Sequence, residues 1–256
     1  MNHFLQVVAE YLPQWGPRLV EAAWVTAGLS LAGFLLALVL GALLVALQRS
    51  HLAPLRHAAR GFIQFMRAVP LLALLLALYF GLPSLGLTLS GYGAGILGLG
   101  VQGSAYVAEV LRGGLDAVHR GQRESALAAG LTPRQVFMHI VLPQALRVML
   151  PPLVNCYVSL LKDSSLCALI ATNELMLTAR AIASEDFLPL HIFVLVGLFY
   201  FAIAFPLSML SRLLGMRLAR GRRSMGGSPG PSRLGAFPRL RWRRLRAARL
   251  PVTERL

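Results

Sequence analysis

A run of four polar residues interrupts one of the longest apolar stretches of this chain. Lys162 and Asp163 fall within residues 146–170, and Ser164 and Ser165 follow them directly. Ionisable side chains at membrane depth are costly, and by default they mark a path for a polar solute. Neighbouring residues of a helix point about 100° apart, so Lys162 and Asp163 cannot neutralise each other face to face. We therefore expect a polar path or gate here, with an interhelical hydrogen-bond knot as the structural alternative.

A further acidic residue, Glu109, stands at the end of another apolar stretch. Arg112 follows it by three residues, a spacing at which opposite charges pair on a helix. The pair could fix the helix end, or Glu109 could line the same polar path. Both interpretations stay open.

The sequence offers no catalytic machinery of its own. Its one lysine, Lys162, follows Leu161, whereas a nucleotide-binding P-loop needs Gly-Lys-Ser/Thr. We also find no metal-ligand cluster and no catalytic triad in the sequence. We therefore expect a chain that is not an enzyme and binds no cofactor, so that any energy from ATP must come from a partner chain.

The composition places these residues in a membrane. Apolar residues make up 56% of the chain and charged residues 14%, against roughly 45–50% and about 25% in soluble domains. The stretches Trp24–Gln48 and Ala68–Ala108 contain no Asp, Glu, Lys or Arg. About 20 apolar helical residues cross a bilayer. The sequence thus excludes a soluble domain, a disordered chain and a disulfide-stapled module, and predicts an all-α polytopic membrane protein.

The long uncharged stretch must be divided, because residues 83–91 are rich in glycine, serine and proline, which favour turns. Before the first span, residues 1–18 are expected to be extracytoplasmic, with a short interfacial helix that Pro13 ends. The glycines of 91–103 are typical of close helix packing in a bilayer. In all, we predict five transmembrane helices, at 24–47, 62–82, 92–111, 146–170 and 187–210.

Positive charge alternates along the connections between these helices. Arginines are concentrated in 48–61, in 112–145 and after 210, whereas 171–186 is mainly acidic. Residues 211–256 alone hold 13 Arg and one Glu, which is most of the net charge of +15. Since Lys and Arg mark the cytoplasmic side, we predict an extracytoplasmic N-terminus and a cytoplasmic C-terminus. Residues 216–256 are expected to be a disordered, Arg-rich cytoplasmic tail.

The longest cytoplasmic connection carries the signals of two short helices that meet at a sharp turn. Residues 124–129 are rich in alanine and predict a helix, and Gly130 suits its C-terminal cap. Thr132 suits the N-cap of a second helix, with Pro133 at its first position. Gln135 completes a capping box with Thr132.

The second helix is expected to end near Pro143. Such a helix–turn–helix could read DNA, but Arg134 and His139 are the only basic residues that this helix offers, and membrane spans flank it closely. A loop that only joins two spans would be shorter. We therefore expect residues 121–143 to be a docking surface for a cytoplasmic partner.

These residues also carry a family resemblance. Glu124, Ser125, Ala126, Gly130, Ile140, Leu142 and Pro143 match the Glu-Ala-Ala (EAA) motif of permease subunits of binding-protein-dependent ABC importers, except that Ser125 replaces an alanine. Further runs resemble the polar amino acid uptake branch, whose transporters carry histidine, glutamine, arginine or glutamate: Arg67-Ala68-Val69-Pro70, Gly121-Gln122, Pro143-Gln144-Ala145-Leu146-Arg147 and Lys162-Asp163-Ser164-Ser165-Leu166. The resemblance covers about residues 15–215.

The resemblance implies a type I ABC importer permease fold over 19–215, in a bacterial inner membrane and surrounded by lipid. It implies a second permease subunit, identical or homologous, and two ATPase subunits that bind ATP and Mg²⁺. It also implies an extracytoplasmic solute-binding protein that delivers a polar amino acid. The residues that it assigns to ATPase coupling are Gly121, Gln122, Glu124, Ser125, Ala126, Gly130, Ile140, Leu142 and Pro143.

Two other functions compete with this interpretation. An ion-coupled secondary transporter would tend to have inverted repeats and more spans, and five spans cannot divide into equal halves. A membrane-anchored regulator would use the helix–turn–helix or the basic tail on nucleic acid, whereas the importer interpretation expects no nucleic acid partner. Co-purification would separate the three, because only the importer holds an ATPase.

Overall fold

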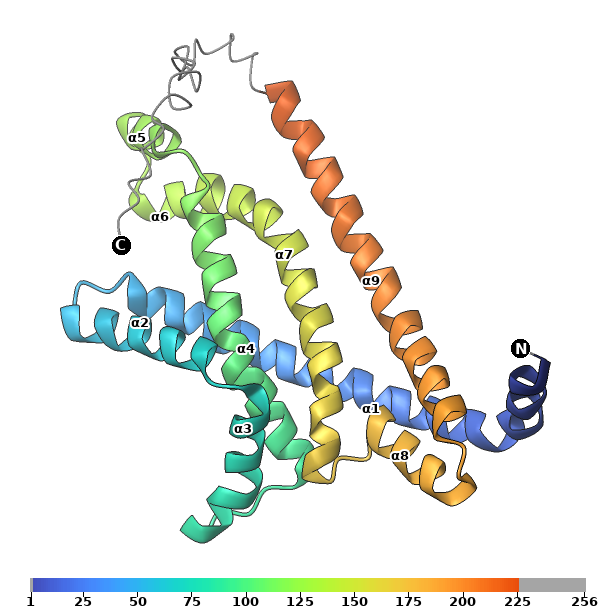
Figure 1. Ribbon diagram of the computed structural model, residues 1–256. Coiled ribbons are helices and arrows are strands. Elements are labelled where there is room, and N and C mark those ends of the chain that lie inside the picture. Colours follow the sequence, from blue (N-terminus) through green and yellow to red (C-terminus); the bar gives the residue numbers. More distant parts are fainter. Residues whose placement is uncertain (1, 226–256) are drawn as a thin grey trace, which may run out of the picture. The chain divides into compact units, whose positions relative to one another are not determined.

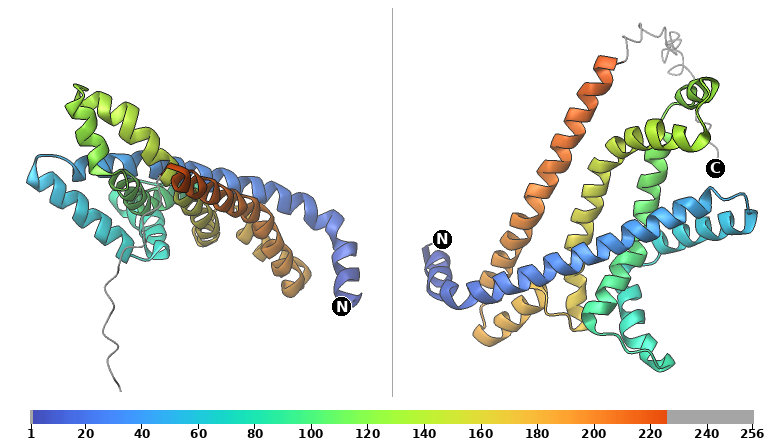
Figure 2. Two further views of the ribbon diagram at one scale, coloured as in Figure 1. Left: turned by 90° about the horizontal axis from the view of Figure 1, so that it is seen from above. Right: turned by 180° about the vertical axis from the view of Figure 1, so that it is seen from behind.

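The computed structural model describes residues 2–225, and within this range the chain is helical and contains no strand. Met1–Leu218 form one compact unit (Figure 1). The long N-terminal helix crosses the other long helices at a steep angle, as the right-hand view of Figure 2 also shows. The elements are α1 (Asn2–Gln48), α2 (Ala53–Ala68), α3 (Leu71–Leu76), η1 (Ala77–Gly81), η2 (Leu82–Leu85), α4 (Gly91–Asp116), α5 (Arg120–Ala128), α6 (Pro133–Gln135), η3 (Val136–Val141), α7 (Leu142–Asp163), η4 (Ser164–Ile170), α8 (Leu175–Asp186) and α9 (Pro189–Met225).

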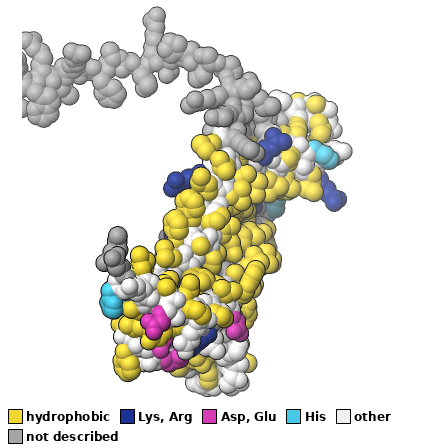
Figure 3. Space-filling model, turned by 90° about the vertical axis from the view of Figure 1, so that its right-hand side faces the viewer, with side chains coloured by type: hydrophobic (Ala, Val, Ile, Leu, Met, Phe, Trp, Pro, Cys, Tyr) yellow, Lys and Arg dark blue, Asp and Glu magenta, His cyan; other side chains and the backbone are white. Residues whose placement is uncertain are grey.

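Four helices of the described residues are long and apolar enough to cross a membrane, or five when the bent pair α2–α3 counts as one span. The face in Figure 3 has hydrophobic side chains over its middle. On that face the Asp and Glu side chains gather at the lower end, and most Lys and Arg side chains lie at the upper end. This distribution fits the predicted polytopic membrane protein.

The first predicted span lies within α1, but the helix begins much earlier than expected. Pro13 and Pro17 both lie inside α1, so the prediction that Pro13 ends a separate short helix is wrong. A proline removes one backbone donor and bends a helix without necessarily ending it. Figure 1 shows such a bend near the N-terminal end of α1.

The second predicted span, 62–82, is not one straight helix. It breaks between α2 and α3, which meet at a bend of 103°. Val69, the residue before Pro70, has an extended backbone with φ −78° and ψ 130°. Proline disfavours the helical conformation of the residue before it and cannot donate to the preceding turn. The Val69-Pro70 pair therefore ends α2 and starts a new helix in another direction.

Helix α4 lies at the centre of the packing, and its glycines permit the close contacts. A Cβ at Gly100 would come within 2.5 Å of the Leu36 side chain of α1, and one at Gly103 would meet Leu160 of α7. A Cβ at Gly91 would collide with the carbonyl oxygen of Ile170. The predicted role of these glycines in close helix packing is therefore confirmed.

The second half of the chain differs from the prediction in three places. The helix that starts at Pro133 does not end near Pro143, because it continues through a π-helical turn, η3, into α7. The N–H of Leu142 donates to the carbonyl of Phe137, five residues back. We attribute the continuation of the helix past Pro143 to this wider turn. Pro143 lacks a backbone N–H, but it follows a stretch in which the helical hydrogen-bond pattern is already irregular.

The other two differences lie further along. The predicted loop 171–186 contains a helix, α8, whose N-cap is the side chain of Glu174. The last span begins at Pro189 instead of 187, because Phe187 adopts a left-handed conformation with φ 54°. Helix α9 then extends to Met225, so the tail predicted to begin at 216 starts as helix, and its remainder, 226–256, lies outside the described residues.

Candidate functional site

The turn between α5 and α6 has the geometry that the sequence predicts. Gly130 has φ +86°, the left-handed conformation of a helix C-terminus. The N–H of Leu131 donates to the carbonyl of Ala126 at 3.2 Å, and the N–H of Gly130 to that of Leu127 at 3.0 Å. These two bonds form a Schellman motif, which satisfies carbonyls that the helix end leaves free.

The start of α6 is fixed just as firmly. The side chain of Thr132 accepts the N–H of Gln135, and the side chain of Gln135 accepts the N–H of Thr132 at 2.9 Å. Pro133 takes the first helical position. The predicted capping box is therefore confirmed. With both helix ends satisfied, the angle between α5 and α6 is set by local bonds.

Apolar contacts hold this pair of helices against the membrane part. Ala126 is 7% exposed and packs in one cluster with Val136, Val141 and Ala145. Leu131, in the turn, packs against the same cluster. Burial of these side chains from α5, η3 and α7 joins the turn to the start of α7.

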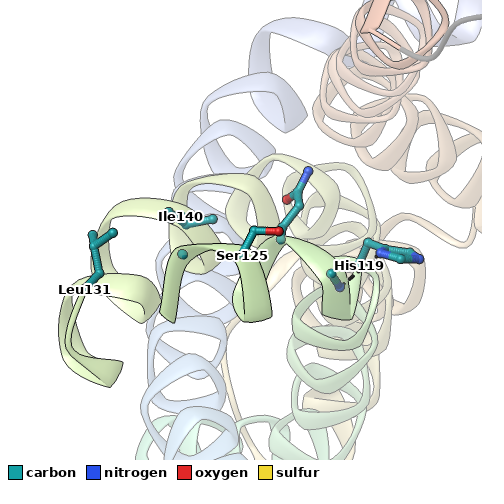
Figure 4. Close-up of a pocket in the computed structure, with 7 residues that line it drawn as sticks. His119, Ser125, Leu131 and Ile140 are labelled. Carbon is teal, nitrogen blue, oxygen red and sulfur yellow. Dashed lines mark hydrogen bonds between the residues drawn. The ribbon is translucent and has the colours of Figure 1, made fainter. Parts of the chain in front are cut away.

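Around α5 the surface is hollowed. A cavity of about 560 Å³ is open to the outside, and Figure 4 draws the residues that line it and labels four of them. Five of the nine predicted coupling residues line it, namely Gly121, Gln122, Ser125, Ala126 and Ile140, together with His119 and Leu131. The structure thus brings most of the predicted coupling residues to one place. The other four, Glu124, Gly130, Leu142 and Pro143, do not line the cavity.

Two residues of this region were not predicted from the sequence. The Nδ1 atom of His119 accepts the N–H of Gly121 at 3.1 Å and so caps the start of α5. The Nη2 atom of Arg123 donates to the carbonyl of Leu115 at the end of α4, at 2.6 Å. Histidine is not among the favoured N-caps, and one arginine within an Arg-rich connection carries no signal that distinguishes it.

The predicted path residues lie on α4, at the end of α7 and at the start of η4. On α7, Lys162 and Asp163 are exposed, and so are Asn155 and Ser159, which share their side of the helix. No ion pair involves Lys162 or Asp163 within residues 2–225. This surface of α7, which we call the polar stripe (Asn155, Ser159, Lys162 and Asp163), is therefore unpaired within the part of the chain that the structure describes.

The two serines that follow are engaged locally. The hydroxyl of Ser164 donates to the carbonyl of Leu161 at 2.7 Å, and that of Ser165 to the carbonyl of Lys162 at 2.7 Å. Ser164 is completely buried. Their hydroxyls thus stabilise the change from α7 to the 3₁₀ helix η4 within this chain.

Glu109 does form the predicted ion pair, with Arg112, at 2.6 Å. The pair belongs to a small network, because Arg112 also lies 3.9 Å from Asp116, and Asp116 is 2.9 Å from Arg49, just after the end of α1. Glu109 and Lys162 lie at different depths. Gly103 of α4 packs against Leu160 of α7, and the two helices run in opposite directions, so Glu109 and Lys162 lie on opposite sides of this contact. At the rise of an α-helix, their levels differ by about 12 Å along α4.

Comparison with known proteins agrees with this geometry. Residues 33–220 match the family described as the binding-protein-dependent transport system inner membrane component. The chain is 36% identical over 182 residues to the probable glutamine ABC transporter permease protein GlnM of Bacillus subtilis, covering 71% of this chain and 84% of that protein. It is 34% identical over 205 residues to the glutamine transport system permease protein GlnP of Escherichia coli, covering 79% and 93%.

Solved structures give the same result. A crystal structure of an amino acid ABC transporter with histidines has a chain that is 28% identical, with a TM-score of 0.77, and the match covers 84% of this chain and 98% of that one. The methionine ABC transporter MetNI, in an inward facing conformation, is 22% identical with a TM-score of 0.60 over 77% of this chain, and shares the fold.

The chain therefore belongs to the inner membrane components of binding-protein-dependent transport systems, which are the permease subunits of ABC importers. The importer interpretation is supported over both the ion-coupled transporter and the nucleic-acid-binding regulator.

Proposed function

We propose that this permease imports a polar amino acid, with ATP hydrolysed by two ATPase subunits that bind its α5–α6 turn. A second permease subunit, identical or homologous, would complete the membrane part, and an extracytoplasmic binding protein would deliver the substrate. ATP and Mg²⁺ would be bound by the ATPases. The observation that carries the proposal is the doubly capped turn at Gly130, with a cavity that most of the predicted coupling residues line.

A docking role explains why the turn is so well defined. The Schellman bonds and the capping box orient α5 relative to α6, and the cluster around Ala126 fixes both to α7. A helix that a partner displaces needs such support, because a helix that can tilt freely would not pass the displacement on to the transmembrane helices. Four of the coupling residues are exposed and so accessible to an ATPase, namely Gln122, Glu124, Ser125 and Gly130.

The polar stripe of α7 suits a zwitterionic substrate. Lys162 and Asp163 carry opposite charges and have no ion-pair partner within residues 2–225. Amino acids carry one charge of each sign at their backbone groups, so both side chains can be complemented by one molecule. We place Lys162 and Asp163 on the path itself, with Ser164 and Ser165 supporting the backbone there and Glu109 lying deeper along α4.

The distribution of charge supports the orientation in a bacterial inner membrane. The end that carries α5 and α6 is basic, whereas α8, at the other end, finishes in Glu185 and Asp186. The positive-inside rule then places α5 and α6 in the cytoplasm, with the N-terminus outside and the C-terminus inside.

Uptake and co-purification test this function together. The complex of this chain with its partner ATPase and binding protein should import radiolabelled glutamine, histidine, arginine or glutamate. Import should stop when the ATPase lacks its P-loop lysine and should persist when an ionophore collapses the ion gradients. Import that depends on the ion gradient, or a purified complex without an ATPase, would contradict the proposal.

A further inference from the structure

One arginine of α5 reaches back to the helix that precedes it. The Nη2 atom of Arg123 donates to the carbonyl of Leu115 at 2.6 Å, although the two residues are eight positions apart. Leu115 is 8% exposed and lies in the last turn of α4. The last four carbonyls of a helix lack partners within it, and a cation there also complements the helix dipole. Arg123 is thus a C-terminal cap supplied by another helix.

The guanidinium of Arg123 is held between the two helices. Its Nε atom is buried and has no hydrogen-bond partner within residues 2–225. Arg120, one turn earlier on α5, is exposed and makes no side-chain hydrogen bond within this range. A guanidinium that donates to a carbonyl makes a charge-assisted bond, which is stronger than a bond between neutral groups. Arg123 therefore links α5 to the end of α4, whereas its exposed neighbour Arg120 does not.

The Arg123–Leu115 bond strengthens a short connection between α4 and α5. Helix α4 ends at Asp116 and α5 begins at Arg120, so three residues, Ala117, Val118 and His119, join them. Val118 of this link is 6% exposed and packs in one cluster with Leu115 of α4 and Ala126 of α5, so apolar contacts already restrict the angle between the two helices. The bond between Arg123 and Leu115, one turn into α5, adds a directional polar contact to this packing.

The end of α4 that Arg123 binds is itself joined to the rest of the membrane part. Asp116, next to Leu115, is 2.9 Å from Arg49, the residue that follows α1. A Cβ at Gly114 would collide with Met149 of α7, so the two backbones lie close together there. A displacement of α5 that reaches Leu115 is therefore passed on to α1 and α7 as well as to α4.

We propose that Arg123 is a positioning residue that ties the coupling helix α5 to the end of α4, so that movement of α5 moves the transmembrane helices. The proposal rests on the proposed function, because it assumes that α5 receives its movement from an ATPase. It adds the contact, between Arg123 and Leu115, through which movement of α5 reaches the transmembrane helix α4. Docking of the ATPase and transmission to α4 are then separate steps, and Arg123 serves the second.

The test separates these two steps with two matched variants. Arg123→Met removes the donor but keeps the aliphatic stem, and Arg120→Met removes one charge from the same helix without touching Leu115. The purified complex is reconstituted, and ATPase retention, ATP hydrolysis and uptake of labelled glutamine, histidine, arginine and glutamate are measured. Arg123→Lys, which keeps the charge and a donor, should restore part of the loss.

We expect Arg123→Met to retain the ATPase and to hydrolyse ATP, but to move roughly tenfold fewer amino acids per ATP, as the loss of one charge-assisted hydrogen bond allows. Arg120→Met should keep the normal ratio. Release of the ATPase from Arg123→Met would overturn the proposal, because the residue would then serve docking. An unchanged ratio would also overturn it. A wild-type complex that holds no ATPase would instead overturn the proposed function, and this proposal with it.

A distance measurement checks the mechanical claim directly. Spin labels are placed at Gly113→Cys on α4, where a side chain meets nothing within 4 Å, and at the exposed Ala128→Cys on α5. Cys156 and Cys167 are replaced by alanine. With Arg123 present, the distance between the labels should stay the same when ATP binds. With Arg123→Met, it should change or broaden, and equal behaviour of the two would contradict the proposal.

Discussion

Gln102 of α4 donates a hydrogen bond of 2.6 Å to the carbonyl of Val69, the residue at which the second span breaks. Gln102 is 9% exposed. Because Val69 is extended and Pro70 has no N–H, the helical ladder is interrupted there. A glutamine on a neighbouring helix thus supplies a donor that the backbone lacks, which is how irregular backbone is tolerated within a membrane.

We expect Gln102→Leu to destabilise the protein, because it leaves the Val69 carbonyl without this partner. The cost of an unsatisfied buried acceptor is about 1–3 kcal/mol. The midpoint of thermal unfolding of the purified complex should fall accordingly. Gln64→Leu is the control, since Gln64 is exposed on α2 and makes no side-chain hydrogen bond within the described residues. Equal midpoints for the two variants would show that the break does not need Gln102.

The sequence predicts the turn at Gly130 in detail because its signals are local. Gly130, Thr132, Pro133 and Gln135 each prefer one conformation or one bond, and all of them agree on the same geometry. The ion pair of Glu109 and Arg112 is equally local, since both residues lie on one helix. These features needed no knowledge of distant contacts.

The break at Val69 and the bond of Arg123 could not be predicted in this way. Hydropathy alone does not reveal a bend, because the two segments of a broken span are apolar enough to be taken together as one span. Gln102 is 33 residues from Val69, and its role depends on how α4 packs. The sequence predicts a loop in place of α8 because charged residues stand at both ends of a short apolar stretch, whereas Leu175, Ala179 and Ile182 of this helix are buried in the core.

Close packing of α1 on α4 predicts that Gly100 tolerates no larger residue. A side chain there would run into Leu36, whereas Gly113, on the same helix, faces open space. We expect Gly100→Val to lose about 1–3 kcal/mol of stability, as overpacked cores do. Gly113→Ala should be nearly neutral. Membrane abundance and the unfolding midpoint measure both, and a stable Gly100→Val would contradict the packing.

Charge on the polar stripe should matter for transport more than for assembly. Lys162→Met is expected to insert and to retain the ATPase, because Lys162 has no ion-pair partner within residues 2–225. Uptake should fall by roughly tenfold or more, because the carboxylate of the substrate would lose the charge of Lys162 as its partner. Lys162→Arg, which keeps the charge, should lose less. Failure of Lys162→Met to assemble would favour the interhelical knot instead.

Reporter fusions should reveal the orientation. Because arginine is concentrated at the α5–α6 end, fusions after Ser84 and after Asp186 should report the outside, and one after Gly121 the inside. Alkaline phosphatase and green fluorescent protein give opposite signals and check each other. A cytoplasmic signal at Asp186 would contradict the proposed arrangement of spans.

The central claim is that the turn at Gly130 couples this permease to its ATPase, and two substitutions at one position test it. The left-handed conformation costs a residue with a side chain about 1–2 kcal/mol, and a β-branched residue tolerates it poorly, whereas asparagine visits it more readily. No atom lies within 4 Å of a Cβ at Gly130, so the effect is conformational and not steric crowding.

The most direct measurement is therefore the amount of ATPase retained by affinity-purified Gly130→Val and Gly130→Asn, at equal membrane levels and alongside uptake. The account predicts that Gly130→Val reaches the membrane normally but loses the ATPase and uptake in parallel, while Gly130→Asn keeps most of both. Full retention of the ATPase with normal uptake in Gly130→Val would contradict it.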